Sequence, residues 1–368
     1  MKWLLFIFIS LPALGFDNPH IMRSPKALLM GDAFTAVNDD EYTLFYNPVS
    51  MARHKRDFTL VPFNPQFSAT NILTDGNRFD VVGADPVVSA NALMDYPVHA
   101  QAGISPGFKI FNVGVTFIAN ESYDLLLRNR THPMLDMDIR SDKGLMMGVG
   151  LPIGPGRIGK SGQGSQTSVG LSAKYLERTG LEDTLALTGT TVLDTLSQSE
   201  LDKIMRSLGK VRGIGWGFDA GMEHVVRSGR TQFITGLSAL DINGTDFKVQ
   251  SNPDKLKVAN NRQQVNLGMA LGQNLSIFNY IISADIRDLS NEMEFGRRVR
   301  LGAQVGISGL KIMAGMNSGY YSYGAMLDMK FTRLTVGFYD QEVGSKYKQI
   351  QSKRFVVYLS LFDFSFDA

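Results

Sequence analysis

Apolar and polar side chains alternate with a period of two along most of the chain from Asp57 onward. The side chains of a β-strand point alternately to its two faces, so each such segment has one apolar face and one face of glycine and polar residues. The clearest segment spans 213–223, and the pattern returns at 298–307, 310–317 and 321–331. Less regular segments occur at about 57–63, 98–105, 109–119, 143–153, 166–176, 231–241, 262–272, 275–288, 332–340 and 354–364. The pattern predicts an all-β chain of about fourteen strands.

The lengths of these strands and of their connections predict a transmembrane antiparallel β-barrel. Many segments approach the roughly nine to eleven residues that a tilted strand needs to cross a membrane, whereas strands of soluble sandwiches are nearer five or six. Most connections alternate between long ones, such as 64–97, 120–142 and 177–212, and short ones, such as Arg227–Arg230. Short periplasmic turns and long external loops are typical of transmembrane barrels. We expect residues 57–368 to form the barrel; a soluble periplasmic β-protein is the alternative.

Residues 1–15 have the composition of a cleavable signal peptide. A basic start at Lys2 precedes an apolar run from Trp3 to Leu11, and small residues follow at 13–15. The run is too short to span a bilayer core, and no later segment offers an uninterrupted apolar stretch of spanning length. We therefore expect export, with a mature chain that is periplasmic, secreted or inserted in a membrane as a barrel.

The stretch between this signal and the first strand lacks the strand pattern. It contains small residues, among them Gly31 and Ala33, and an acidic run at 39–41. Pro48 fixes φ, lacks an N–H and disfavours helix at Asn47, whose side chain can bond nearby backbone. We expect a compact, turn-rich unit with a sharp reversal there, and its place before the strands makes it a candidate plug.

The order of residues in this stretch is G-x-A-x-x-A, then aspartates, then N-P, at Gly31, Ala33, Ala36, Asp39, Asp40, Asn47 and Pro48. It resembles the N-terminal signature of the FadL-type outer-membrane family, which includes long-chain fatty-acid transporters, aromatic-hydrocarbon porins and the PorV-like proteins of a secretion system. Val49 stands where that family usually has alanine. The resemblance implies a bacterial outer-membrane barrel, surrounded by its lipids, with residues 16–56 as a plug. Ligand-binding or gating positions are then expected at Gly31, Ala33, Phe34, Asn47 and Pro48.

The same resemblance implies two alternative functions. One is passive uptake of hydrophobic small molecules such as fatty acids, which needs no cofactor. The other is a non-transporting scaffold, similar to the PorV-like relatives, which hold exported proteins at the cell surface; its partner would be an exported protein.

Some of the expected external loops carry apolar residues or a helical pattern. Ser197–Glu200 fits a helix-start box, and apolar residues including Ile204 and Met205 follow at helical spacing. Leu126 and Met134 fall in the expected loop 120–142. Such residues need cover, either from one another as a lid or from a hydrophobic ligand, and both interpretations stay open.

The composition gives no indication of a nucleic-acid or metal-binding protein. Lys and Arg number 37 against 35 Asp and Glu, without a basic run, and cysteine is absent. The five histidines are scattered without metal-ligand spacing. We expect no metal site, and charges on the polar strand faces, such as Asp285 and Arg287, should face the lumen and pair across strands.

Two short segments match the sequences of known phosphate-binding or catalytic motifs but lack the structural context that those motifs need. Residues 154–161 fit the phosphate-binding G-x-x-x-x-G-K-S, but another alternating strand follows where that motif needs a helix, so we expect a turn. Ser207–Lys210 matches S-x-x-K without its companion motifs. No nucleophile, base and orienting group can be assembled, so we expect no catalytic residues and no enzyme.

Overall fold

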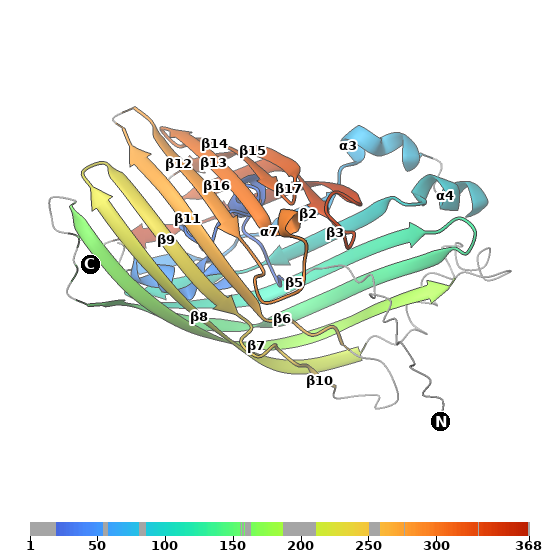
Figure 1. The fold of residues 1–368 in the computed structure, drawn as a ribbon, viewed down its shortest axis with the longest axis horizontal. Helices are drawn as coiled ribbons and strands as arrows, with labels where there is room; N and C mark the ends of the chain where they lie inside the picture. Colours follow the sequence, from blue (N-terminus) through green and yellow to red (C-terminus); the bar gives the residue numbers. More distant parts are fainter. Residues whose placement is uncertain are drawn as a thin grey trace, which may run out of the picture.

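The computed structural model describes residues 20–366 except 54–57, 81–85, 155, 157, 159–162, 187–210, 250–257, 276 and 330. Within these ranges the chain is mostly strand and forms a closed antiparallel β-barrel of 14 strands (Figure 1). The predicted fold class and strand number are therefore confirmed. The expected signal peptide and the expected loop helix with Ile204 and Met205 lie outside the described residues.

The wall follows the chain order, and it closes where β17 pairs with β2. The first strands are β1 (Phe58–Val61), β2 (Gln66–Thr70), β3 (Pro97–Ile104), β4 (Gly107–Ile110), β5 (Val113–Arg128), β6 (Met134–Ile153), β7 (Gly164–Ala186), β8 (Val211–Ser228) and β9 (Thr231–Leu240). The later ones are β10 (Lys248–Val249), β11 (Gln264–Asn274), β12 (Asn279–Ile286), β13 (Val299–Ile307), β14 (Leu310–Asn317), β15 (Tyr320–Met329), β16 (Thr332–Glu342), β17 (Gln351–Leu361) and β18 (Phe364–Phe366). Four of the 14 wall strands are interrupted and carry two labels each: β1 with β2, β3 with β4, β9 with β10, and β17 with β18. Short helices lie in the connections: α3 (Ile72–Asp75), η2 (Gly76–Arg78), α4 (Pro86–Leu93) and α7 (Phe295–Arg298).

Three strands of the wall are interrupted side by side. Residues 62–65 separate β1 from β2, Ser105 and Pro106 separate β3 from β4, and 362–363 separate β17 from β18. Because β1 pairs with β4 and β18 while β2 pairs with β3 and β17, the three interruptions are neighbours. Proline, which cannot donate a backbone hydrogen bond, occupies two positions of 62–65 as well as 106. We call this part of the wall the strand break.

The buried side chain of Asn64 replaces backbone pairing at the strand break. Its Nδ2 donates to the carbonyl of Ser105 at 3.0 Å, and its Oδ1 accepts from the Ser105 N–H at 2.9 Å. Toward β17, Phe63 and Leu361 form an isolated bridge. The wall is thus closed here, but by side-chain bonds and single bridges instead of a continuous ladder.

Strands β5 to β8 are longer than the sequence pattern led us to expect. All 16 residues of β5 pair with β6, and only 129–133 connect the two strands. The expected loop 120–142 is therefore wrong: Leu126 lies on β5, and Met134 begins β6. The expected loop 177–212 is shortened in the same way, because β7 continues to Ala186. The pairing of these strands with each other satisfies backbone groups that a loop would expose.

The expected connection 64–97 also contains more structure than predicted. It includes β2 and the helices α3, η2 and α4. Met94 and Leu127 form a small apolar cluster after α4, with Ala90 packed against it. This connection therefore packs on the external end of β5.

The outer wall carries an apolar band with polar residues at its external edge. On β8 the outward side chains Trp216 and Phe218 are more than half exposed. The Tyr175 ring on β7 meets the Trp216 ring at a centroid distance of 5.0 Å. Just beyond them the outward pair Glu177 and Arg212 forms a 2.6 Å ion pair. An apolar belt bounded by aromatic and then charged side chains is the outer face of a membrane-spanning barrel. Among the described residues, no helix is both long and apolar enough to cross a membrane.

Residues 20–53 lie inside the barrel, and we call them the lumen segment (Figure 1). The segment contains α1 (Pro25–Leu29), α2 (Thr43–Tyr46) and the 3-10 helix η1 (Pro48–Ala52). Ser24 caps α1 by accepting from the Ala27 N–H at 3.1 Å. Together with inward side chains of the wall, the segment forms the main apolar cluster of the molecule.

Candidate functional site

Glycine lets the lumen segment touch the wall backbone. Gly31 has φ +61°, a conformation that side chains disfavour, and its N–H donates to Ser322 Oγ of β15 at 2.9 Å. A Cβ at Gly315 of β14 would lie 2.1 Å from the Gly31 nitrogen, and one at Gly302 of β13 would lie 2.4 Å from the Met30 carbonyl oxygen. The glycines that the sequence places on the polar strand faces therefore make room for this segment.

An aspartate of the wall binds the middle of the segment. Asp285 of β12 accepts from the N–H groups of Phe34 and Thr35, both at 2.8 Å. The neighbouring Ser283 hydroxyl donates to the Ala33 carbonyl at 2.9 Å. Gly31, Ala33 and Phe34 therefore lie together on the inner face of β12 to β15, where each of them contacts the wall.

A second group of contacts fixes the chain reversal. The Asn47 side chain accepts from the Val49 N–H at 3.4 Å, capping η1, and Pro48 occupies the first position of that helix. The Nδ2 atom of Asn47 donates to the backbone carbonyls of Thr35 at 3.3 Å and Leu237 at 3.4 Å. Asn47 and Pro48 therefore produce the predicted reversal and also contact the wall at β9.

A buried ion pair anchors the start of the segment. Arg287, just after β12, lies 2.6 Å from Asp32, whose carboxylate also accepts from the Tyr46 hydroxyl at 3.0 Å. Burial opposes ionisation of Asp32, but Arg287 and the other cationic neighbours, chiefly Arg23, together outweigh it and lower the pKa of Asp32 to about 2. The His20 ring stacks on Tyr46, and burial holds the pKa of His20 well below its usual range. His20 is therefore neutral beside the charged pair.

The acidic run forms the tip of the segment at the end of the barrel with short turns. Asp39 pairs with Lys26 at 2.8 Å, and Glu41 pairs with Arg333 of β16 at 2.6 Å and accepts from the Tyr358 hydroxyl. Asp40, between them, accepts from the Ser24 hydroxyl and from the Tyr42 N–H, and no ion pair to it occurs in the described part of the chain.

Two carboxyl groups of this tip, those of Asp39 and Asp40, differ in their ionisation. Burial and the adjacent Glu41 raise the pKa of Asp40 to about 7 despite the hydrogen bond from Ser24. For Asp39 burial acts in the same direction, but the charge and hydrogen bond of Lys26, together with Lys311 and Arg53, outweigh it and lower the pKa of Asp39 to about 2. Near neutral pH, Asp40 therefore carries a partial charge while Asp39 is ionised.

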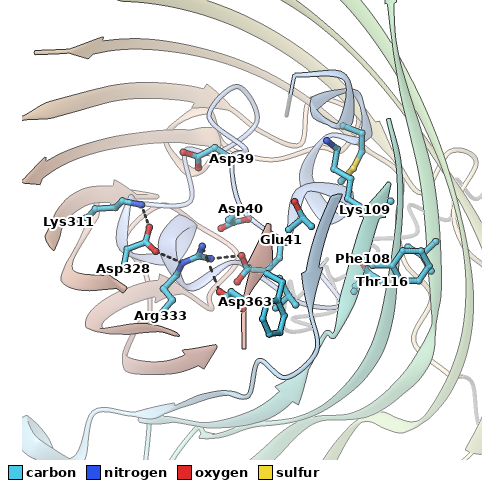
Figure 2. Close-up of a pocket in the computed structure, with 17 residues that line it drawn as sticks. Asp39, Asp40, Glu41, Phe108, Lys109, Thr116, Lys311, Asp328, Arg333 and Asp363 are labelled. Atoms are coloured by element: carbon cyan, nitrogen blue, oxygen red, sulfur yellow. Dashed lines mark hydrogen bonds and ion pairs between the residues drawn. The ribbon is translucent and has the colours of Figure 1, made fainter. Parts of the chain in front are cut away.

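A cavity of about 300 Å³ separates this tip from the wall (Figure 2). On one side Figure 2 shows Arg333 among Asp328, Asp363 and Glu41, with Lys311 bonded to Asp328. On the other side, η1 and strands at or next to the strand break contribute the apolar residues Met51, Val61, Phe108, Val115 and Phe364, together with the polar residues Thr59, Lys109 and Thr116. Phe108 and Phe364 are also exposed on the outer wall, so the cavity reaches the wall at the strand break.

The remaining predicted site residues lie elsewhere. Leu126 is buried with Val343, far along the wall from the cavity lining, and Met134 is partly buried at the start of β6. Ile204 and Met205 lie outside the described residues. The capture site expected on these four side chains stays a prediction.

Several residues of the site were not singled out from the sequence. The sequence pattern marks Glu41 only as part of an acidic run, and it does not mark Asp32, Arg333 or Asn64. Arg333 and Asn64 follow no motif, since their roles depend on strands that meet only in the closed barrel. Asn64 lies between two prolines in a strand-like segment, and that signal indicates an interruption.

Neither family models nor curated proteins match the chain. Among solved structures it is similar to the CymD monoaromatic hydrocarbon channel, with 11% identity, a TM-score of 0.49, and coverage of 95% of this chain and 99% of that one. It is also similar to the toluene transporter TbuX of Ralstonia pickettii, with 8% identity, a TM-score of 0.43, and coverage of 94% and 99%. A third is the toluene transporter TodX of Pseudomonas putida, with 9% identity, a TM-score of 0.43, and coverage of 92% and 98%.

Proposed function

We propose that this protein is an outer-membrane channel for passive uptake of hydrophobic small molecules such as fatty acids. The lumen segment is its plug and gate, and no cofactor or catalytic step takes part. The observation that supports the proposal most directly is the cavity between the acidic tip of the segment and the apolar residues of the strand break.

The size and lining of the cavity suit a small hydrophobic molecule. Its volume is about 300 Å³, whereas an apolar cavity of roughly 150 Å³ already holds benzene. Met51 and Val115 offer apolar contact, whereas Arg333 with its ion-pair partners and the side chain of Lys109 offer polar contact. A molecule with an apolar body and one polar end matches this division.

Two movements would connect the cavity with its surroundings. Loss of the Glu41–Arg333 pair would free the acidic tip and widen the passage toward the short-turn end. Loss of the Asn64–Ser105 bonds would separate the first two strands of the wall where backbone pairing is already interrupted. The second movement gives a lateral path between lumen and bilayer.

The test is uptake of labelled fatty acids and aromatic hydrocarbons by a deletion strain carrying wild-type protein or a variant. Thr116→Trp, whose buried side chain lines the cavity, should reduce uptake several-fold. Thr332→Trp, on the outer face of β16, is the matched control and should transport as wild type. Heat-modifiable migration on gels checks that all the barrels fold.

Unchanged uptake across the whole panel in the deletion strain would contradict the channel. If an exported protein co-purified in that case, the scaffold would be the better account. Equal transport by Thr116→Trp and wild type would leave the channel in place but reject this cavity as its path.

A further inference from the structure

The outer wall has a recess of about 560 Å³ beside the strand break, on the opposite side of the wall from the lumen segment. It crosses β17, β2, β3, β5 and β6. Small side chains form part of its floor, since Ala102 of β3 and Ala119 of β5 lie beside the larger Phe67 of β2 and Val357 and Leu359 of β17. The recess therefore has the width of several strands and an apolar base.

Across the recess, from β17 to β6, the strand register places apolar side chains first and polar side chains last. Val357 pairs with Phe67, Phe67 with Ala102, and Ala102 with Glu121. Glu121 in turn pairs with Ser141, two residues before Lys143 on β6. Inward neighbours such as Asn120 and Asp142 are buried, whereas Glu121 and Lys143 are exposed, so both charges point outward.

The two charges lie at the external edge of the apolar band. In the wall Lys143 pairs in register with Glu177, which with Arg212 marks that edge on β7 and β8. Glu177 is bonded to Arg212, and Lys143 forms no ion pair within the described ranges. Glu121 accepts only a long 3.5 Å bond from Ser141 there. A cation and an anion thus stand close together on one face without pairing with each other.

We propose that the recess binds a membrane phospholipid with a zwitterionic phosphoethanolamine headgroup. Its phosphate lies against the Lys143 ammonium and its own ammonium against the Glu121 carboxylate. One acyl chain covers Ala119, Ala102 and Phe67 down to Leu359. The complementary pair of charges selects this headgroup, because a purely anionic lipid would place a second negative group beside Glu121.

This interaction would also cover the strand break from the membrane side. Pro65, Gly103 and Ile104 line the recess immediately next to the Asn64–Ser105 bonds. A chain lying there excludes other molecules from the outer face of the break. Lipid binding goes beyond the proposed transport function and does not depend on it.

The experiment is native mass spectrometry of the purified full chain with phosphatidylethanolamine and phosphatidylglycerol of identical acyl chains. Wild type should retain phosphatidylethanolamine preferentially. Lys143→Glu and Ala119→Trp should each reduce this retention about tenfold, roughly 1.4 kcal/mol. Ala314→Trp, on the outer face of β14, fills no part of the recess and should bind as wild type.

The double change Glu121→Lys with Lys143→Glu reverses both charges and should restore binding of phosphatidylethanolamine in part. Equal retention of the two lipids by wild type would overturn the proposed headgroup contacts. Equal retention by Ala119→Trp and Ala314→Trp would overturn the recess as the site. These measurements involve no uptake, so their failure is distinct from failure of the channel.

Discussion

The guanidinium of Arg287 lies 2.6 Å from the carboxylate of Asp32, and each of these side chains is only 4% exposed. One belongs to the lumen segment and the other follows β12, so the pair joins the segment to the wall. Solvent and salt screen the attraction between these two charges much less than that of the exposed pair Glu177–Arg212 on the outer face. Glu41–Arg333 and the Ser50 hydroxyl bond to Glu223 join the segment to the wall in the same way.

Replacing Arg287 by Met should loosen the segment. The change leaves the Asp32 carboxylate buried without its partner, at a cost of about 3 to 5 kcal/mol. Single-channel leak in planar bilayers should rise at least tenfold, with the barrel still heat-modifiable. Arg212→Met, which breaks the exposed pair, is the control and should leave the leak unchanged. Equal leak in both variants would show that this ion pair does not hold the segment.

Gly315→Ala should displace the segment by steric contact alone. The new Cβ would lie 2.1 Å from the Gly31 nitrogen and 2.2 Å from the Met30 carbonyl carbon, both of them backbone atoms that cannot yield cheaply. Overpacking of this kind costs about 1 to 3 kcal/mol. Gly272→Ala on β11 is the matched control, because its Cβ would have no neighbour nearer than 3.4 Å. Limited proteolysis of residues 20–53 should be faster for Gly315→Ala, and the same rate in both variants would contradict the close contact.

Raising the pH should destabilise the position of the acidic tip inside the barrel. The pKa of Asp40 is about 7 in the seated segment and near its ordinary value of 3.8 once the tip is solvated. The seated form therefore binds more protons between pH 4 and 7, so its stability is greatest below pH 4 and falls until about pH 7. Above that pH both forms are ionised and the effect levels off.

Leak measured from pH 4 to 8 should follow this curve in wild type. Asp40→Asn cannot ionise, so the difference between its leak and that of wild type should grow with pH and then become constant. A pH profile of identical shape in both proteins would assign the dependence to other groups.

Asn47→Ala and Pro48→Ala should each leave the barrel folded and raise the leak. Asn47 loses the cap of η1, worth about 1 kcal/mol, and its bonds to the Thr35 and Leu237 carbonyls. Pro48→Ala removes the fixed φ at the first position of η1 and should have the smaller effect. Leak equal to wild type in both cases would leave these residues without a gating role.

The barrel could be predicted from the sequence because the period of two follows directly from strand geometry. The error at 120–142 arose from expected strand length, not from a missing pattern. Leu135, Met137 and Ile139 alternate with Asp136, Asp138 and Arg140 there, and the strand simply continues beyond the apolar band. The alternation of apolar and polar residues therefore predicts the extent of this strand better than the length required to cross a membrane does.

The site was predictable only in part. Asn47–Pro48 produces a reversal for local reasons, and the structure has it where expected. Which wall residue meets which residue of the segment is not a local property. Asp285 lies 251 residues from Phe34, and Arg333 lies 292 residues from Glu41. Such pairs depend on how the closed barrel positions its inner face, and no spacing in the sequence encodes that.

These long separations also constrain how the molecule assembles. The lumen segment precedes every strand that the structure describes, yet its partners Asp285, Ser322 and Arg333 lie on or next to strands near the carboxyl end. Contacts between residues so distant form late, because most of the chain must be ordered before they can be made. The residues of this segment are thus among the first to be synthesised and the last to acquire their native neighbours, and closure of the wall between β17 and β2 must enclose them as it happens.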